Sequence, residues 1–484
     1  MFSALTLFVA IYLLVTVGIG LLASGKVHSS RDYVVAGRSL PLFVVAATVF
    51  ATWFGSETVL GIPGRFMEEG LGGIVEDPFG AAFCLIFVGV FFAAHLYRKN
   101  LLTIGDYYRD RYNHTVEFLT SVAIIISYLG WVSAQLTAMG LVFNVVTGGE
   151  VSVVAGILLG SSIVLVYTLF GGMFSVAWTS AFQMVVIVFG LFYLAWYLGD
   201  KAGGVGTVIE YVDTAGKLEF WPEPTLPDML AFIGAAVTLM LGSIPQQDVF
   251  QRVTSAKDER TAVWGSILGG SFYLVFAFIP IFLVSSAFLI DPAMVEATMA
   301  EDAQHVLPTL IMNDTPLFAQ IIFFGALLSA IMSTAAGTLL APSVTFTENI
   351  LKGYLNKDIS DEKFLLTIRI TVVIFTCCVT AFALNSESSI YEMVGNAYCV
   401  TLVSAFVPLA FGVYWKRATT QGALFAIAAG LSVWIGMDFI TPMINPDFET
   451  IWPGQLAGLL ASITGMIVGS LIPQMIAKGD QAAA

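Results

Sequence analysis

The chain has 484 residues, of which 57% are hydrophobic and 11% are charged, and its mean hydropathy is +0.87. A typical soluble domain is about one quarter charged, so this composition excludes a soluble protein and indicates a polytopic helical membrane protein. The net charge of −14 argues against a nucleic-acid partner. Hydrophobic runs recur from Ser3 to Ala477 without a long polar interval, which predicts a single membrane domain over residues 1–484.

Apolar runs long enough to cross a bilayer divide the chain into thirteen predicted transmembrane helices. We expect these helices at residues 3–23, 41–66, 78–97, 116–145, 151–170, 178–199, 229–254, 261–290, 317–347, 363–385, 389–414, 420–440 and 454–476. The first run lacks a basic stretch before it and a cleavage site after it, so it is expected to be a retained span. The loop from Asp200 to Asp228 contains three prolines and is expected to be irregular.

The Lys and Arg residues lie mostly in the loops on one side of the predicted spans. Seventeen of the 20 fall on one side of the membrane, and only Arg65, Lys201 and Lys217 fall on the other. By the positive-inside rule, the first side is cytoplasmic, with the N-terminus outside and the C-terminus inside. A missed or invented span would break this alternation, which supports the count of thirteen. We therefore expect a multi-pass protein of the plasma (inner) membrane.

The second predicted span is interrupted by a polar, glycine-bearing patch within Ala46–Gly64, AATVFATWFGSETVLGIPG. A buried Glu57 is expensive in lipid, and a helix that loosens at membrane depth leaves backbone groups unpaired. Such a patch is tolerated where it lines a cavity or binds a ligand. We interpret it as a broken helix that holds an ion and a solute near the membrane midplane. The alternative is an ordinary tilted helix whose Glu57 reaches the membrane surface.

The span at residues 229–254 contains a second interruption. Gly242 and Pro245 lie in its middle, and Gln246, Gln247 and Asp248 follow directly. Proline removes a backbone donor and clashes with the preceding helical turn, so this span is also predicted to be broken.

The two broken spans occupy matching positions in the chain. Residues 41–199 and 229–414 each hold five predicted spans, and because five is odd, the second set enters the membrane with opposite polarity. Interrupted spans at corresponding positions of inverted halves are the best sequence indication of a transporter binding site. The helix at residues 3–23 and the two helices at 420–476 are expected to be peripheral to this core.

The span at residues 317–347 carries hydroxyl groups on one face. Ala330, Ser333 and Thr334 are spaced i, i+3 and i+4 and project to the same side. Hydroxyls on a small-residue face also join helices to each other. A hard cation, however, needs about six oxygen ligands, and the open carbonyls of the broken span at 41–66 could supply the others.

Five stretches, in order along the chain, resemble the solute:sodium symporter family, whose members share the inverted-repeat architecture of the leucine-transporter fold. They are RDYVVAGRSLP (Arg31–Pro41), ATWFGSETVLGIPG (Ala51–Gly64), GGMFSVAWTSAFQ (Gly171–Gln183), SIPQQDVFQRV (Ser243–Val253) and LLSAIMSTAAGTLL (Leu327–Leu340). The resemblance covers nearly the whole chain. It implies an all-α fold with a five-plus-five inverted-repeat core, and sodium-coupled symport of a small organic solute by alternating access.

The resemblance also implies a sodium site. Its ligands would be the backbone carbonyls of Ala51, Phe54 and Ala330 and the hydroxyls of Ser333 and Thr334. Some members of the family use a second sodium site that needs an Asp after the paired glycines. Here that position is Ser180, and the two further hydroxyls expected for that site are replaced by Ala336 and Gly337. These departures imply one sodium per cycle, and they leave open a variant that couples to protons instead.

The family's solute lies beside the break in the span at 41–66. The candidate contacts are therefore Trp53, Ser56, Glu57, Thr58, Trp131, Gln135, Gln246, Gln247, Asn396 and Tyr398. The stretch SIPQQDVFQRV also resembles the corresponding part of high-affinity choline transporters, although Gln246 stands where a further Trp is expected. Trp53 and Trp131 could offer aromatic faces to a cation. No Lys or Arg is expected at mid-membrane to pair a substrate carboxylate, so an amino or organic acid would have to use a half-helix N-terminus. A cationic or zwitterionic solute is expected ahead of a sugar.

Other classes of protein fit the sequence less well. No His lies near a second candidate ligand or nucleophile, and no metal-ligand spacing or phosphate-binding loop is present, so no enzyme, cofactor or metal other than sodium is expected. The four cysteines lie in apolar runs and are expected to be packing residues. A transporter-like solute sensor is an alternative, but only Ile476–Ala484 follows the last span. We expect the protein to function as a monomer in the lipid bilayer.

Overall fold

The computed structural model describes residues 3–352, 359–386, 389–445 and 450–476. Helices make up nearly all of these residues, and within these ranges the one extended pairing is an isolated parallel bridge between Leu40 and Ala256. The predicted all-α membrane fold is therefore confirmed. The predicted cytoplasmic C-terminus, residues 477–484, lies outside the described residues.

The helices follow one another in the order that the hydropathy pattern predicts. The first half of the chain contains α1 (Ala4–Ser24), α2 (Ser30–Val35), η1 (Ala36–Arg38), α3 (Leu42–Trp53), η2 (Glu57–Gly61), α4 (Ile62–Glu69), η3 (Gly72–Ile74), η4 (Val75–Gly80), α5 (Ala81–Phe87), η5 (Val88–Phe92), α6 (Ala93–Lys99), α7 (Ile104–Arg111), α8 (His114–Val146), α9 (Val153–Lys201) and α10 (Val205–Thr214). The second half contains α11 (Leu226–Gly242), α12 (Gln247–Thr254), α13 (Glu259–Phe276), α14 (Phe278–Ile290), α15 (Pro292–Met299), η6 (Ala303–His305), α16 (Val306–Asp314), α17 (Leu317–Thr345), η7 (Phe346–Leu351), α18 (Asp361–Ala383), α19 (Ile390–Thr401), η8 (Leu402–Phe406), α20 (Val407–Tyr414), α21 (Thr420–Ile435), η9 (Gly436–Ile440), α22 (Thr441–Ile444) and α23 (Gly454–Leu471).

Within the described ranges, ten helices are long and apolar enough to cross a membrane, and two bent helix pairs raise the number to twelve. Helix α9 has 49 residues, which corresponds to about 73 Å and is more than twice the thickness of a hydrocarbon core. Its backbone leaves the helical conformation at Gly172, with φ 49° and ψ −139°. This kink lies between the predicted spans at 151–170 and 178–199. Counting α9 as two spans gives thirteen, and that count stays a prediction.

Both predicted helix breaks are present. Helix α3 ends at Trp53, Phe54 has the non-helical angles φ −76° and ψ 76°, and the chain bends by 54° into η2 and α4. Glu57 follows this break and is 1% exposed, so its side chain does not reach the surface of the protein. Helix α11 ends at Gly242 and bends by 47° into α12. The segment between α11 and α12 contains Pro245, whose missing N–H explains why the helix stops there.

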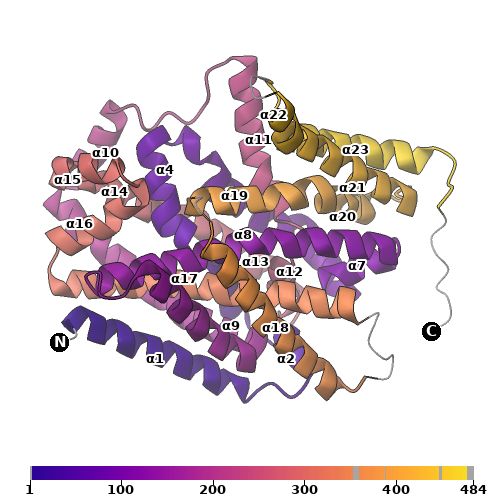
Figure 1. The fold of residues 1–484 in the computed structure, drawn as a ribbon, viewed down its shortest axis with the longest axis horizontal. Coiled ribbons are helices and arrows are strands. Elements are labelled where there is room, and N and C mark those ends of the chain that lie inside the picture. Colours follow the sequence, from indigo (N-terminus) through magenta and orange to yellow (C-terminus); the bar gives the residue numbers. More distant parts are fainter. Residues whose placement is uncertain (1–2, 353–358, 387–388, 446–449, 477–484) are drawn as a thin grey trace.

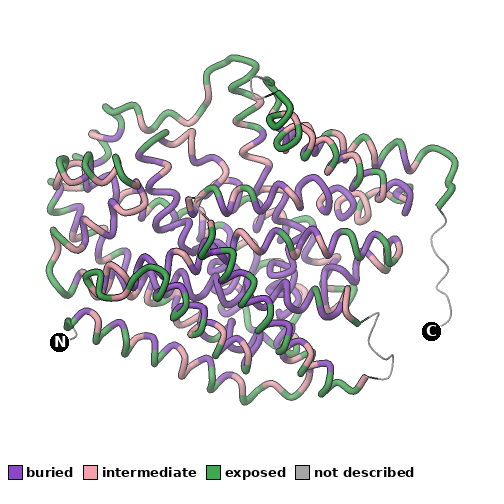
Figure 2. Tube along the Cα trace, viewed as in Figure 1, coloured by how far each residue is buried: buried purple, intermediate pink, exposed green. Residues whose placement is uncertain are grey.

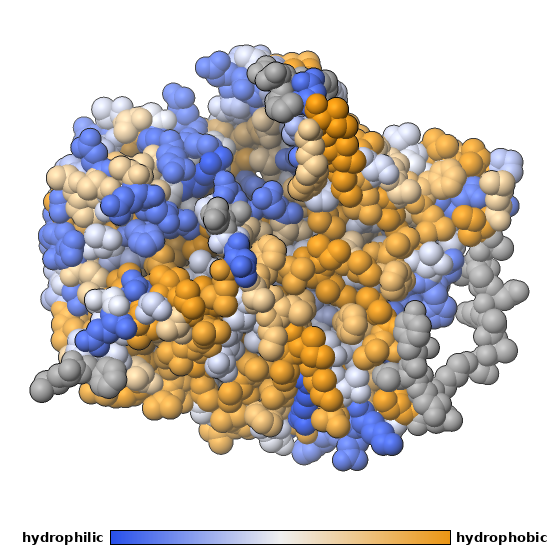
Figure 3. Space-filling model, in the orientation of Figure 1, coloured by the Kyte–Doolittle hydropathy of each residue, from blue (hydrophilic) through white to orange (hydrophobic). Residues whose placement is uncertain are grey.

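The most buried helices lie at the centre of the bundle. Helix α1 packs on α9 and α17 along one edge, whereas α21 and α23 pack against each other along the opposite edge (Figure 1). Residues along α8 and α17 are mostly buried, and exposed residues gather on the peripheral helices (Figure 2). Apolar residues cover the middle of the visible face, with hydrophilic residues concentrated over the end that carries α10, α15 and α16 (Figure 3). The loop at 200–228, expected to be irregular, contains helix α10.

Helix α12 is tied to the chain that precedes α3. The backbone N–H of Leu40 donates to the carbonyl of Ser255 at 3.0 Å, and the carbonyl of Leu40 accepts from the N–H of Lys257 at 3.0 Å. The Gln251 amide donates to the carbonyl of Val34 at 2.9 Å. These bonds connect α12, the second part of the second broken helix, to the segment that leads into the first.

Candidate ion and solute site

The end of α3 meets the hydroxyl face of α17. The Thr334 hydroxyl donates to the carbonyl of Ala51 at 3.1 Å, and the Ser333 hydroxyl donates to the carbonyl of Ala330 at 2.9 Å. These four residues and Phe54 are all 0% exposed. The structure thus brings together the two elements that the sequence assigned to one sodium site.

The backbone of Gly55 lies at the point where these elements converge. A Cβ atom placed on Gly55 would lie 2.8 Å from the Thr334 hydroxyl, 2.7 Å from a Glu57 carboxylate oxygen and 2.9 Å from the Gln135 amide oxygen. Oxygen atoms from η2, α8 and α17 therefore surround one glycine at the break in the first broken helix. This position joins the candidate ion ligands to the candidate solute contacts.

The oxygens at the end of α3 and on α17 have the chemistry of a site for a hard monovalent cation. Carbonyl and hydroxyl oxygens are hard ligands that carry no full charge. Ligands that sit about 2.4 Å from a hard cation at right angles are about 3.4 Å apart, close to the 3.1 Å between the Thr334 hydroxyl and the Ala51 carbonyl. Within the described ranges, no group of three or more His, Cys, Asp or Glu residues is placed to hold a metal ion.

Glu57 is held by side chains of α8. The Gln135 amide donates to one carboxylate oxygen of Glu57 at 2.6 Å, and the Trp131 indole N–H donates to the other at 3.4 Å. The Gln135 amide oxygen in turn accepts the backbone N–H of Ser56 at 2.9 Å. A buried carboxylate needs such donors, and both come from the helix that the sequence predicted to face the break.

Aromatic rings form a cluster beside this carboxylate. Trp53 and Trp131 are stacked, with ring centroids 5.0 Å apart and planes 24° apart. Tyr398 of α19 meets both indoles edge-on, with centroid distances of 5.3 Å and 5.4 Å. Tyr128 stacks on the other face of the group, 5.9 Å from Trp131. Three of the predicted solute contacts therefore form one aromatic cluster, and Tyr128 adds a fourth ring to it.

The other predicted contacts lie in different surroundings. Gln246 is fully buried and donates to the hydroxyls of Ser127 at 2.9 Å and Thr401 at 3.4 Å. The Gln247 amide oxygen accepts the backbone N–H of Ile104 at 2.8 Å, at the start of α7 and outside the aromatic cluster.

Thr58 and Asn396 also point away from the aromatic cluster. The Thr58 hydroxyl donates to the carbonyl of Trp53 at 2.7 Å and lies 3.1 Å from the hydroxyl of Tyr273. Asn396 is exposed and lines a separate hollow on the predicted outer side.

One arginine lies inside the bundle, because Arg252 is 1% exposed. Its guanidinium is already paired, so the expectation that no Lys or Arg is available to pair a substrate carboxylate at mid-membrane stays a prediction. Its guanidinium donates to the Asp248 carboxylate at 2.9 Å and to the carbonyl of Thr48 at 2.8 Å. The Tyr128 hydroxyl also donates to Asp248. The space beside Arg252 is provided by Gly337, where any side chain would overlap the guanidinium. The cation on α12 that the sequence placed on the cytoplasmic side is thus part of a buried ion pair.

The Asp248→Asn variant is expected to unfold at a markedly lower temperature than the wild type. Removing one partner leaves the Arg252 guanidinium buried and unpaired, which typically costs about 3–5 kcal/mol. The combined Asp248→Leu and Arg252→Met variant should recover much of this loss, because it buries no charge. Thermal unfolding of the purified proteins measures both effects. An unchanged unfolding temperature for Asp248→Asn would show that the pair contributes little.

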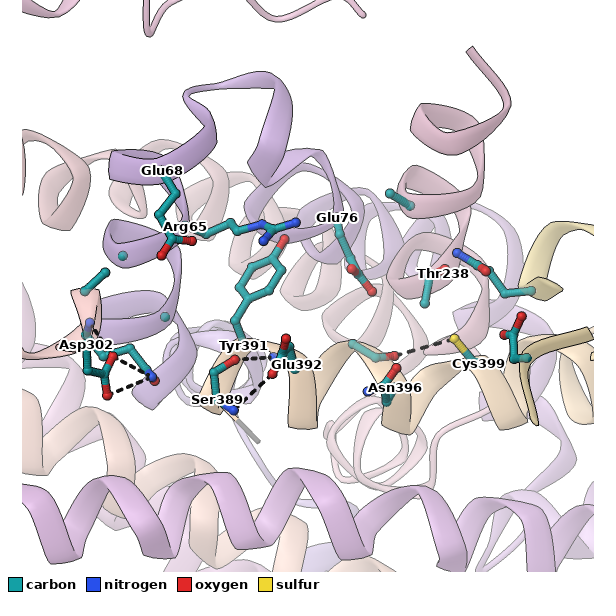
Figure 4. Close-up of a pocket in the computed structure, with 18 residues that line it drawn as sticks. Arg65, Glu68, Glu76, Thr238, Asp302, Ser389, Tyr391, Glu392, Asn396 and Cys399 are labelled. Carbon is teal, nitrogen blue, oxygen red and sulfur yellow. Dashed lines mark hydrogen bonds between the residues drawn. The ribbon is translucent and has the colours of Figure 1, made fainter. Parts of the chain in front are cut away.

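A hollow of about 410 Å³, hereafter the vestibule, opens on the predicted outer side (Figure 4). Its walls come from α4, η4, α11, η6, α19 and η9. The charged residues that line it are Arg65, Glu68, Glu76, Asp302, Glu392 and Asp438. Five of these six are acidic, so the vestibule favours cations.

Sequence reasoning missed Glu76 and its neighbour Asp77. The predicted span began at residue 78, whereas the structure continues helical turns back to Gly72. An acidic residue inside a membrane span is a functional candidate by default. The signal was therefore present, but the predicted boundary placed both carboxylates in a loop.

Two broken helices in one bundle, with an oxygen-lined break beside buried aromatic rings, define a secondary transporter. A family model described as the sodium:solute symporter family matches residues 33–430. The chain is 26% identical to high-affinity choline transporter 1 of Drosophila melanogaster, over 95% of this chain and 76% of the relative. It is 26% identical to the sodium/glucose cotransporter of Vibrio parahaemolyticus, over 91% and 86%, and 24% identical to an osmoregulated proline transporter of Bacillus subtilis, over 97% and 95%.

Solved structures show the same fold. A sodium-coupled sialic acid symporter in a substrate-bound outward-open state superposes with a TM-score of 0.81, at 17% identity, over 96% of both chains. A closed nucleobase-cation-symport-1 family transporter superposes with a TM-score of 0.56, at 16% identity, over 90% of this chain and 94% of that chain. The chain belongs to the sodium:solute symporter family. It is a multi-pass membrane protein that carries a solute together with sodium by alternating access.

Proposed function

We propose that this symporter takes up a small organic cation or zwitterion from the outer side. The observation that carries the proposal is the Glu57 carboxylate, 1% exposed and bonded to the Trp131 indole beside the stacked rings of Trp53 and Trp131. A desolvated cation gains about 2 kcal/mol from an aromatic face and more from a carboxylate. The acidic vestibule supports the same class of solute. Four rings and an anion offer no comparable advantage to a neutral sugar.

The coupling ion is proposed to bind between α3 and α17. Its ligands are the carbonyls of Ala51, Phe54 and Ala330 and the hydroxyls of Ser333 and Thr334, and the cycle carries one sodium. Sodium in this position joins two helices of opposite halves and fixes the break at Gly55, whose surroundings include Glu57. Because the coupling is reciprocal, solute binding strengthens sodium binding by the same factor. The membrane potential adds about 2.3 kcal/mol per charge per 100 mV to uphill uptake.

The proposed architecture follows the inverted halves. Residues 41–199 and 229–414 form the two five-span repeats, and the break at the start of each repeat lies in the centre of the bundle. The helices at 3–23 and 420–476 are peripheral, in agreement with their places at opposite edges (Figure 1). We place the N-terminus outside and the C-terminus inside a plasma (inner) membrane, and propose that the monomer is the transport unit.

A thermal-shift screen of the purified protein tests the solute and the ion together. We expect choline to raise the unfolding temperature in sodium chloride but not in potassium chloride, because a ligand that binds only the folded state stabilises it. Proline and glucose are the comparison solutes. Stabilisation by glucose alone would contradict the proposed solute class, and equal stabilisation in both salts would contradict sodium coupling at this site.

The Trp131→Ala variant is expected to bind choline about 30-fold more weakly than the wild type. This factor corresponds to the loss of one desolvated cation–π contact of about 2 kcal/mol. The measurement is a choline titration of the unfolding temperature in sodium. Trp196→Ala is the matched control, because Trp196 is 68% exposed and faces away from the bundle. Unchanged choline affinity in Trp131→Ala, with the same response to sodium, would show that the aromatic cluster does not hold the solute.

A further inference from the structure

A second, much smaller cavity lies at the floor of the vestibule. Its volume is about 10 Å³, and the polar groups that line it are Glu57, Glu76, Asp77 and Tyr391. Glu76, Tyr391 and Gly395 also line the vestibule, so the two spaces adjoin. A cavity needs about 10–15 Å³ of such volume to hold one water molecule. The cavity is therefore large enough for one water at most, and it lies between the vestibule wall and the side chain of Glu57.

Two carboxylate oxygens in this region lack a hydrogen-bond donor. Asp77 is 2% exposed, and one of its oxygens accepts the hydroxyl proton of Tyr273 at 2.5 Å. Its other oxygen, Oδ2, has no partner, and neither has the buried Oε1 of Glu76. An ionised carboxylate only accepts hydrogen bonds, whereas a protonated one also donates. A proton on Asp77 turns Oδ2 into a donor, and the Tyr391 hydroxyl, which lines the same cavity, also has no hydrogen-bond partner.

Arg65 is the cation among the described residues that line the vestibule with Glu76, and the ion pair that it forms there is with Glu69. The other titratable groups around the cavity and the adjoining vestibule wall are Glu57 of η2, Arg65, Glu68 and Glu69 of α4, Tyr273 of α13, Asp302 before η6, Tyr391, Glu392 and Cys399 of α19, and Asp438 of η9. Helix α11 contributes Leu239 to the cavity. The Arg65 guanidinium pairs with Glu69 at 2.8 Å and lies 5.9 Å from the Tyr391 ring centre (Figure 4). The described carboxylates are also not grouped closely enough to hold a metal ion.

A glycine leaves room for the Glu76 carboxylate beside the cavity. A Cβ atom on Gly395 would lie 3.1 Å and 3.2 Å from the two carboxylate oxygens of Glu76. The Tyr273 hydroxyl, which fixes one oxygen of Asp77, is itself 3.1 Å from the Thr58 hydroxyl. Asp77 is therefore positioned by a side chain of α13, Glu76 lies against the backbone of α19 at Gly395, and one oxygen of each acid is left for a small occupant.

We propose that Asp77 and Glu76 form a proton-binding site at the floor of the vestibule, which is loaded from the outer solution through the vestibule and the one-water cavity. The symporter then binds a second kind of ion besides sodium, beside a cavity that Glu57 also lines. The proton removes one negative charge next to Glu57. Sodium binding, which adds a positive charge near Glu57, consequently depends on whether this site is loaded.

Infrared spectroscopy of the purified protein in detergent tests the site without any solute. The carbonyl stretch of a protonated carboxyl group is separate from that of a carboxylate, so we expect a protonated-carboxyl band at neutral pH in the wild type. The Asp77→Asn variant should lose the part of this band that comes from Asp77, which the difference between the two spectra isolates. Asparagine keeps an acceptor for Tyr273 and places an amide donor at the position of Oδ2, so this variant is expected to fold. The control is Asp302→Asn at the vestibule rim, where the Asp302 side chain is 42% exposed.

A second measurement uses sodium alone as the probe. The sodium concentration that gives half of the maximal thermal shift should vary with pH in the wild type and in Asp302→Asn, and should be independent of pH in Asp77→Asn. Absence of a protonated-carboxyl band in the wild type, or an unchanged band in Asp77→Asn, overturns the proposal. Equal pH dependence of sodium binding in all three proteins also overturns it. None of these outcomes depends on the solute or on the ligands assigned to sodium.

Discussion

Replacing both Ser333 and Thr334 with alanine is expected to abolish sodium-dependent uptake and to remove the thermal stabilisation by sodium. The change deletes two of the five proposed ligands, and the three remaining carbonyls cannot complete the coordination of a hard cation. The Thr334 hydroxyl is also the group that bonds across to Ala51 on the broken helix. Binding of radioactive sodium to the purified protein, and uptake into reconstituted vesicles, measure the effect.

Ser343→Ala is the matched control for this pair. Its hydroxyl lies on the same helix, is equally buried, and bonds to the carbonyl of Leu339 within α17 at 2.9 Å. We expect this variant to bind sodium as the wild type does. Retention of sodium-dependent uptake in the double variant would show that sodium is held elsewhere.

Gly55→Ala is expected to eliminate transport while the rest of the bundle remains folded. The added methyl group would lie within 2.9 Å of oxygens from Glu57, Gln135 and Thr334, a distance at which at least one of these side chains must move. Those side chains belong to the proposed solute pocket and the proposed sodium site. The added methyl group should therefore weaken the binding of both sodium and the solute. Separate titrations with sodium and with choline measure the two affinities.

The control for this substitution is Gly325→Ala on α17, where a Cβ atom would meet nothing within 4 Å. Exchanging an open helical glycine for alanine stabilises by about 0.4–1 kcal/mol, so this variant should transport normally. Normal sodium affinity in Gly55→Ala would mean that the break tolerates a side chain, and that the ion and solute sites are farther apart than the contacts around Gly55 indicate.

The fold and the two breaks could be predicted because their causes are local. Pro245 cannot donate a backbone hydrogen bond, and Gly55 and Glu57 interrupt an otherwise apolar run, so the sequence alone marks both interruptions. The pairing of Thr334 with the end of α3 was a further prediction, and the 3.1 Å bond to Ala51 agrees with it. The assignment of sodium to these oxygens remains a proposal.

The side-chain partners inside the bundle could not be predicted, because they depend on packing between distant segments. Arg252 follows a short polar run, and nothing local shows that Asp248, Tyr128 and the carbonyl of Thr48 would enclose it. Gln247 carries the same functional group as its neighbour Gln246, yet it bonds to the backbone of α7. Because Gln246 and Gln247 are adjacent, their side chains leave the start of α12 in different directions and reach different neighbours.

Hydrogen bonds join α12 and the residues just after it to the segment before α3. Leu40 bonds to Ser255 and Lys257, and Gln251 bonds to Val34. Because these bonds join the segment before α3 to the end of α12, we expect the two segments to move together when access to the site alternates. Removing the Gln251 side-chain bond by mutation would let α12 and the segment before α3 move independently. The expected phenotype is uncoupled transport, in which sodium crosses the membrane down its gradient without the solute.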